Sequence, residues 1–198
     1  MSSNFHFRTA TADDAPRLQD LIQSAFRALD KNNTWVGSPE LAASFSIELD
    51  VVLDRITSPD GKILIASETK DGPAVGCVAV FKRSPGYGRL ALLAVDPNMH
   101  RGGLGRQILA YGEEYLAREM GVTKFGLNAL ITREELIKWY ERQGYVKTGE
   151  TSAIPLERNW GQDIPDELVF VEMDKEDRKS VEQGRSVDLG GRRLNKNK

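Results

Sequence analysis

Hydrophobic and polar positions alternate along the chain in blocks whose period changes several times. Near the N-terminus, Phe5 and Phe7 alternate with polar residues over 5–10, which predicts a strand. Residues 11–30 carry apolar side chains at helical spacing, with Thr11 placed as N-cap, and predict a helix. After a polar loop, the spacing predicts a second helix over 40–56.

Strand patterns dominate the rest of the chain, interrupted by two further helices. A helix is predicted over 104–120, ended by Gly121, and another over 132–143, with Thr132 and Glu135 forming a capping box and Gly144 as the stop. The tripeptide "GYG" at 86–88 is expected to turn the chain into the strand at 89–96. The predicted strands lie at 62–67, 74–82, 89–96, 124–131, 145–151 and 166–173, the first two joined as an antiparallel hairpin.

This order of elements predicts an α/β fold of the mixed α+β type. We expect a central mixed sheet of about seven strands flanked by about four helices. The chain has 198 residues, of which 40% are hydrophobic and 28% charged, as expected for one domain with a sizeable core.

Charge and cysteine content limit the classes of binding partner and the cellular compartments that we expect for this chain. The formal net charge is −2, and residues 174–198 hold eight Lys/Arg against five Asp/Glu, so the body of the chain is acidic. That balance argues against nucleic-acid binding, and the absence of a long apolar run argues against a membrane partner. Cys77 is the sole cysteine and the N-terminus shows no signal segment, which favours a cytoplasmic location, with a nuclear one left open.

The end of the chain differs from the rest in composition. Residues 175–198 have almost no apolar periodicity and predict a disordered tail. Within it, "DRKSVEQGRSVDLGGRRL" resembles the translation of a common sequencing adapter, so one interpretation is that part of the tail is not genuine protein sequence. A genuine basic arm or nuclear signal is the alternative.

A glycine-rich loop separates the strand at 89–96 from the following helix. Gly102, Gly103 and Gly105 stand where free backbone N–H groups and the positive end of the helix dipole attract an anion. The loop therefore predicts a phosphate-bearing ligand, with a tight structural turn as the alternative. It has neither the Lys-Ser/Thr pair of a P-loop nor the third glycine of a dinucleotide fingerprint, since Ile108 stands there.

Two motifs resemble those of the GNAT superfamily of acyl-CoA N-acyltransferases. "VDPNMHRGGLGRQIL" at 95–109 is similar to the family's acyl-CoA motif Q/R-x-x-G-x-G/A, with His100 in place of Gln or Arg and with Gly103 and Gly105 in the two small positions. "REELIKWYERQGYVKTGE" at 133–150 is similar to the second signature, although Arg133 stands where the family often has Asn. The order of elements matches from Phe7 to Met173, which implies an N-acetyltransferase domain at 5–174 followed by the tail.

The resemblance implies acetyl-CoA as cosubstrate, no metal, and a specific binding path. The diphosphate would rest on the amides of 101–106, and the pantetheine arm would lie between splayed parallel strands at 90–95 and 124–130. The cofactor-binding residues expected on this basis are Leu93, Ala94, Val95, His100, Arg101, Gly102, Gly103, Leu104, Gly105, Arg106, Asn128 and Arg133.

The resemblance also implies direct attack of an amine on the thioester, with Tyr140 as the acid that protonates the leaving thiolate. The helical stripe that Tyr140 shares with Leu136 and Ile137 allows a purely structural role as the alternative. Cys77 is expected to be a buried small side chain and not a nucleophile. Glu68, Asp96, Asn128 and Glu150 remain open as routes for the amine's proton.

Trp35 and Trp160 are expected to line the acceptor site, on loops at 29–40 and 152–165, with a structural role as the equal alternative. The main interpretation is an N-acetyltransferase that acts on a primary amine of a small molecule or peptide, as a monomer or homodimer. The alternatives are a catalytically weak acyl-CoA sensor or scaffold of the same fold, and a phosphate-binding module of another fold.

Overall fold

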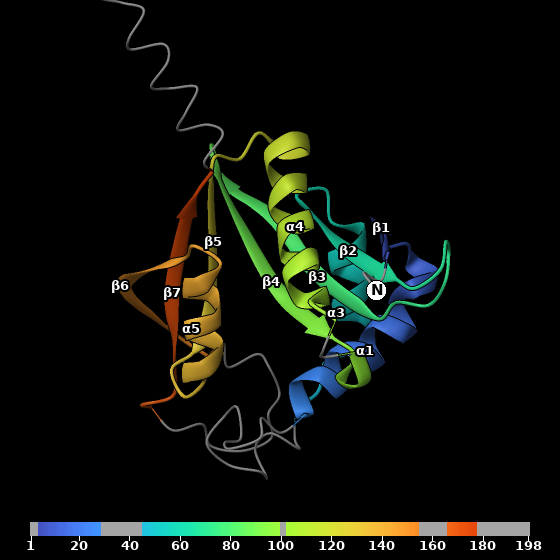
Figure 1. The fold of residues 1–198 in the computed structure, drawn as a ribbon, viewed down its shortest axis with the longest axis horizontal. Coiled ribbons are helices and arrows are strands. Elements are labelled where there is room, and N and C mark those ends of the chain that lie inside the picture. Colours follow the sequence, from blue (N-terminus) through green and yellow to red (C-terminus); the bar gives the residue numbers. More distant parts are fainter. Residues whose placement is uncertain (1–3, 29–44, 100–101, 155–165, 178–198) are drawn as a thin grey trace, which may run out of the picture.

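A computed structural model describes residues 4–28, 45–99, 102–154 and 166–177. Within them a single mixed sheet of seven strands is covered by helices on both faces (Figure 1). The helices are α1 (Ala15–Arg27), α3 (Leu49–Thr57), α4 (Leu104–Met120) and α5 (Glu134–Arg142), with short 3-10 turns at Ala12–Asp14 and Pro97–Met99. The expected fold class is confirmed.

The strands run in the order β1-β2-β3-β4-β5-β7-β6 across the sheet. All neighbours are antiparallel except β4 and β5, which are parallel. The strands are β1 (His6–Thr9), β2 (Gly61–Ser67), β3 (Gly76–Ser84), β4 (Tyr87–Val95), β5 (Lys124–Leu130), β6 (Val146–Ala153) and β7 (Val169–Glu176).

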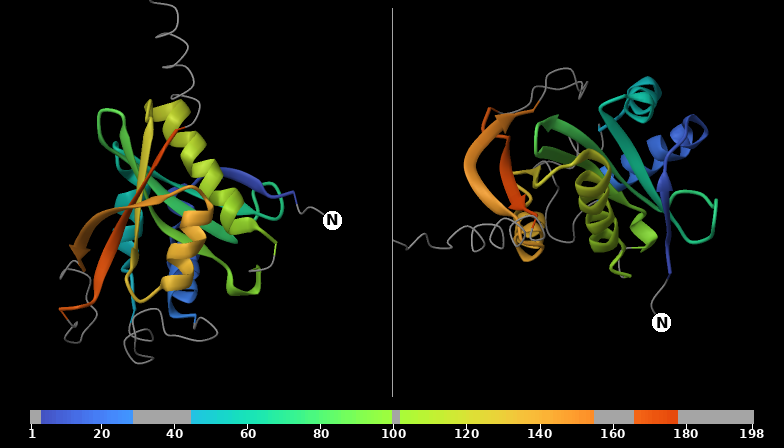
Figure 2. Two further views of the ribbon diagram at one scale, coloured as in Figure 1. Left: turned by 60° about the vertical axis from the view of Figure 1, so that its left-hand side comes forward. Right: turned by 90° about the horizontal axis from the view of Figure 1, so that it is seen from above.

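Each face of the sheet has its own hydrophobic core. On one face α1 and α3 insert buried residues such as Leu18 and Val52 against β2 and β3. On the other face α4 and α5 insert Ile108 and Ile137, so the helices sit in two pairs on opposite sides (Figure 2). Side chains that alternate along each strand therefore point into one core or the other, as period-two patterning requires.

The parallel strands β4 and β5 pair over only three residues. Tyr87, Gly88 and Arg89 pair with 124–126, after which the two strands diverge, as Figure 1 shows. The edge of β4 from Leu90 to Val95 has no strand partner on the β5 side within the described residues. The expected splayed pair of parallel strands is thus present.

A β-bulge against β3 bends β4 in the stretch that has no partner on its β5 side within the described residues. Cys77 pairs with Ala94 but Ala79 pairs with Ala91, so β4 carries one extra residue. Leu92 takes a φ of +50°, a left-handed conformation that costs free energy for a branched side chain. As a result Ala91 and Leu92 both pack toward the α1/α3 face, and the alternation resumes with Leu93 on the other face.

Three local predictions are wrong in their details. The first is the helix at 40–56, which starts only at Leu49 in the described part of that segment. The carbonyls of Phe45 and Ile47 accept hydrogen bonds from Arg27 Nε (2.6 Å) and Gln19 Nε2 (2.8 Å), so α1 side chains satisfy backbone groups that a helix would otherwise pair.

The second is the turn placed at "GYG", which lies at Pro85–Gly86 and leaves Tyr87 and Gly88 inside β4. The third is the capping box of α5. The helix begins at Glu134 with Arg133 as N-cap, so Glu135 occupies the second helical position and cannot complete the box. Its carboxylate pairs with Lys138 at 2.8 Å.

Strand β7 continues to Glu176, and Lys175 pairs in register with Phe125. The ordered sheet therefore reaches two residues past the expected end of the domain at 174. Residues 178–198 lie outside the described residues, so the tail and its origin stay predictions.

Candidate active site

A cavity of about 870 Å³ fills the space where β4 and β5 diverge. Its walls come from both strands, from α4 and α5 on one side, and from β6, β7 and the aromatic pair Phe26 and Phe45 on the other. These two rings stack with their centroids 5.0 Å apart. The lining residues therefore come from both faces of the sheet.

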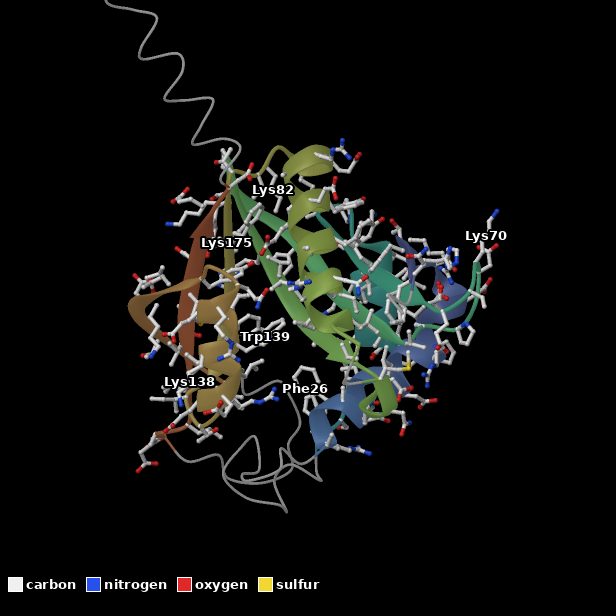
Figure 3. All side chains as sticks on the ribbon, in the orientation of Figure 1. Phe26, Lys70, Lys82, Lys138, Trp139 and Lys175 are labelled. Atoms are coloured by element: carbon white, nitrogen blue, oxygen red, sulfur yellow. The ribbon has the colours of Figure 1, made fainter. Side chains whose placement is uncertain are left out.

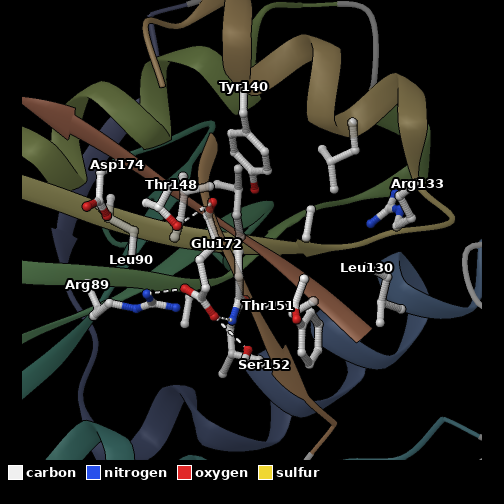
Figure 4. Close-up of a pocket in the computed structure, with 18 of the residues that line it drawn as sticks. Arg89, Leu90, Leu130, Arg133, Tyr140, Thr148, Thr151, Ser152, Glu172 and Asp174 are labelled. Carbon is white, nitrogen blue, oxygen red and sulfur yellow. Dashed lines mark hydrogen bonds and ion pairs between the residues drawn. The ribbon is translucent and has the colours of Figure 1, made fainter. Parts of the chain in front are cut away.

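Tyr140 reaches this cavity from α5. Its side chain is 6% exposed, and its ring meets Trp139 and Tyr145 edge-on, with centroids 5.1 and 5.9 Å away. The hydroxyl points into the cavity (Figure 4) and has no hydrogen-bond partner among the described residues. Burial raises the pKa of Tyr140 to about 12, against a smaller lowering by the charge of Arg133. The phenol is therefore protonated at neutral pH and free to donate.

The glycine loop lies at the C-terminal end of β4, where α4 begins. Gly103 is the N-cap of α4 with a φ of +68°, and the first intrahelical bond runs from Gln107 N–H to Gly103 O at 3.2 Å. The amides of 103–106 precede that bond and have no partner inside the helix. Leu104 is buried in the α4/α5 core and anchors the turn, while Arg106 is exposed.

The start of α4 also lies beside α5 and the end of β4. A Cβ on Gly105 would stand 3.8 Å from both Val95 and Trp139, which points from α5 towards α4 (Figure 3). By contrast, a Cβ on Gly102 or Gly103 would have no heavy atom of the described residues within 4 Å. Among the described residues, the backbone at Gly102 and Gly103 thus has room in front of it for a bulky anion.

The three β4 residues expected to bind the cofactor present different groups. Leu93 lines the cavity, Ala94 is buried in the α1/α3 core, and Val95 packs on the other face. Their backbone edge towards β5 is unpaired within the described residues, so the main chain is the part of Ala94 and Val95 available to a ligand.

A polar network that the sequence analysis did not anticipate lines the cavity on the face opposite α5. Arg89 Nη1 donates to Glu172 Oε2 at 2.5 Å. Asn128 Nδ2 and Ser152 Oγ donate to the other oxygen, Oε1, at 3.0 and 2.6 Å (Figure 4). Burial alone would raise the pKa of Glu172, but these three donors outweigh it and lower the pKa, so the carboxylate is ionised at neutral pH.

Tyr87 joins β4 to β7 by crossing over β5. Its hydroxyl donates to Asp174 at 3.0 Å, and Asp174 also pairs with Lys124 at 2.9 Å. The crossing is possible because Gly126 of β5 has no side chain: a Cβ there would lie 1.9 Å from the Tyr87 hydroxyl oxygen. Tyr87 and Arg89 together hold the two halves of the sheet at the point where they begin to diverge.

We expect Gly126→Ala to lower the free energy of unfolding by about 1–3 kcal/mol, because the methyl group displaces the Tyr87 ring and its hydrogen bond. Tyr87→Val removes the ring, so adding Gly126→Ala in that background should cost much less. Urea unfolding of the four proteins measures the coupling. Strictly additive effects would show that Tyr87 does not require the glycine.

The other residues predicted from sequence fall into three groups. Asn128 and Arg133 line the cavity, and Asn128 faces the Glu172 network. Among the proton routes left open, Glu150 also lines the cavity, whereas Glu68 and Asp96 do not. His100, Arg101, Trp35 and Trp160 lie outside the described residues.

Cys77 is fully buried beneath the bulge, where its thiol lies 3.6 Å from the Leu92 carbonyl. Burial raises the pKa of Cys77 to about 12, so the thiolate form is scarce at neutral pH. In the part of the chain that the structure describes, no group of three or more His, Cys, Asp or Glu is arranged to hold a metal ion. No helix of that part is long and apolar enough to cross a bilayer.

Comparison with known proteins shows which family this chain resembles. Residues 59–147 match the family described as the acetyltransferase (GNAT) domain. The S-(2-succino)cysteine N-acetyltransferase of Bacillus subtilis is 28% identical over 151 residues, which cover 73% of this chain and 86% of that protein.

Solved structures show the same fold at lower identity. The ribosomal-protein-S18-alanine N-acetyltransferase of Escherichia coli superposes with a TM-score of 0.63 at 15% identity, covering 88% of this chain and 94% of that one. A variant of the spermidine N-acetyltransferase of Vibrio cholerae gives 0.64 at 11% identity, covering 92% and 99%.

The fold and these matches define the protein as an acyltransferase. It has the fold of the GNAT N-acetyltransferases, and residues 59–147 are similar to that family's domain. The names of these proteins give S-(2-succino)cysteine, a ribosomal-protein alanine and spermidine as acceptors, so the similarity leaves the acceptor of this chain open.

Proposed function

We propose that the protein transfers an acetyl group from acetyl-CoA to a primary amine by direct attack, without an acyl-enzyme. The observation that carries this proposal is the Tyr140 hydroxyl, which projects without a protein partner among the described residues into the cavity between β4 and β5. The buried state of Cys77 supports a direct transfer, because no accessible thiol stands in the described cavity wall.

The residues present fit acetyl-CoA. The open space in front of Gly102 and Gly103 leaves room for the diphosphate, and the amides of 103–106 supply donors and the positive helix end. The unpaired edge of β4 would hydrogen-bond the pantetheine arm as a strand would. When bound, acetyl-CoA supplies an activated acyl carbonyl and a thiolate leaving group.

Tyr140 would then donate its proton to the departing sulfur. The apolar surroundings that raise the pKa of Tyr140 also disfavour a charged thiolate. The departing sulfur is therefore more basic there and takes the proton of Tyr140 more readily. For the amine's proton, Asn128 and Glu150 line the cavity and would hold a water that carries it out. Trp35 and Trp160 remain proposed walls of the acceptor site, and His100, Arg101 and Arg133 proposed contacts to CoA.

The second candidate function is an acyl-CoA sensor that binds without turnover. The sequence features that favour it are His100 and Arg133, which depart from the family motifs. The relative's name makes S-(2-succino)cysteine the first acceptor to try, followed by a peptide with an N-terminal alanine and by spermidine.

We expect calorimetry to detect acetyl-CoA binding, and a thiol-release assay with these amines to detect turnover. The nucleotides ATP and NAD serve as ligand controls, since they share phosphates but lack the pantetheine arm. Binding of acetyl-CoA with no thiol release from any amine would favour the sensor. Failure to bind acetyl-CoA would overturn both candidates.

A further inference from the structure

We propose that the acceptor amine carries a carboxylate, and that Arg89 binds it at the end of the cavity where β4 and β5 are still paired. This inference rests on the proposed acetyl transfer and specifies the substrate class of the same site. It starts from the hydrogen-bonding capacity that the cavity wall leaves unused.

Among the described residues, Arg89 uses only Nη1 of its guanidinium group in hydrogen bonds with other residues. Nη1 donates to Glu172 and, at 3.4 Å, to the Tyr87 hydroxyl oxygen. Nε and Nη2 have no hydrogen-bond partner among the described residues. The side chain lines the cavity with an exposed fraction of 16%, and Figure 4 shows the guanidinium turned toward its interior. Two planar donors therefore remain for a ligand, in the fork geometry that suits a carboxylate.

The acids next to Arg89 have little capacity left to bind a polycation. Glu172 already accepts three hydrogen bonds, and Asp174 accepts from Tyr87 and Lys124. A second arginine, Arg83, is exposed at the cavity wall with no ion-pair partner among the described residues. Among the described residues, the groups without a protein partner on the wall formed by β3 and β4 are therefore cationic donors, which would bind an anion.

The opposite wall offers the complementary charge. Glu150 on β6 is exposed and lines the cavity, and its side chain has no partner among the described residues. An acceptor with a carboxylate toward β4 and an ammonium group toward β6 would match both walls. The stacked rings of Phe26 and Phe45 line the same cavity and would supply apolar surface for the carbon chain of such an acceptor. This pattern favours amino-acid-like amines over polyamines.

The test compares amino acids bearing one or two carboxylates with their amides, in the thiol-release assay and in calorimetry on the CoA-saturated protein. We expect the wild-type protein to prefer each acid to its amide. We expect Arg89→Lys, which keeps a cation beside Glu172 but loses the planar fork, to raise the KM for the acids by about tenfold. The KM values for the amides and for acetyl-CoA should stay near those of the wild-type protein.

Two further variants sharpen the comparison. Arg83→Gln should raise the KM for acids with a second carboxylate, while Arg118→Gln on the outer face of α4, where the side chain is 74% exposed, should change nothing. Thermal unfolding checks that Arg89→Lys is folded.

Equal kcat/KM for acids and amides, an equal effect of Arg89→Lys on both, or the absence of any binding of a carboxylated amine would overturn the inference. Turnover of amines without a carboxylate would leave the acetyltransferase proposal intact. Failure of the wild-type protein to bind acetyl-CoA would instead overturn the acetyltransferase proposal.

Discussion

Tyr140→Phe is expected to lower kcat by about 100- to 10,000-fold, the range for loss of a general acid. The substitution removes only the hydroxyl, which has no hydrogen-bond partner among the described residues. The ring keeps its edge contacts with Trp139 and Tyr145, so the free energy of unfolding and the KM for acetyl-CoA should change little. Steady-state kinetics with a good acceptor gives kcat and the KM for acetyl-CoA, and thermal unfolding gives the stability.

The pH dependence tests the same role. Because burial raises the pKa of Tyr140 to about 12, the phenol stays protonated through the range in which amines lose their protons. In the wild-type protein kcat should therefore rise with pH as the amine deprotonates and show no alkaline fall below about pH 10.

The matched control is Tyr111→Phe on α4, a phenol that does not line the cavity and whose ring packs against Phe7 with centroids 4.9 Å apart. Its kcat should equal that of the wild-type protein. If Tyr140→Phe also kept full turnover, Tyr140 would be a core residue, as its helical stripe with Leu136 and Ile137 allows.

Much of the architecture follows from local patterns. The apolar runs of β2 and β3, the helical stripe of α1 and the glycines that flank α4 each act over a few residues. The structure places these elements within about four residues of the predicted bounds. Errors arise where partners distant in sequence decide the outcome. Nothing in the local sequence at 45–48 indicates that Arg27 and Gln19 satisfy its carbonyls and keep it out of a helix.

The Arg89–Glu172 pair was missed for the same reason. The two residues are 83 positions apart and meet only because β7 inserts between β5 and β6, a register that the sequence pattern does not define. One signal was available: Arg89 is a lone charge in an otherwise apolar strand, "RLALLAV", whose central position makes an unpaired cation costly. The bulge at Leu92 had no such signal, because leucine rarely adopts a positive φ.

Gly102→Glu is expected to weaken acetyl-CoA binding by about 100-fold while leaving the fold intact. Gly102 is exposed, and a Cβ there would have no heavy atom of the described residues within 4 Å. A carboxylate within about 5 Å of the diphosphate would cost on the order of 1–4 kcal/mol of binding free energy, depending on the local dielectric. Calorimetry with acetyl-CoA gives the Kd, and thermal unfolding checks the fold.

Gly103 is avoided as a test position because its φ of +68° would add backbone strain to any substitution. Gly102→Lys supplies the matched control, because it adds a chain of similar length with the opposite charge. If the loop holds the diphosphate, the lysine variant should bind at least ten times more tightly than the glutamate variant, and the difference should shrink as salt rises. Equal affinities in both variants would mean that the amides of 103–106 face no phosphate, and that the cofactor enters the cavity by another route.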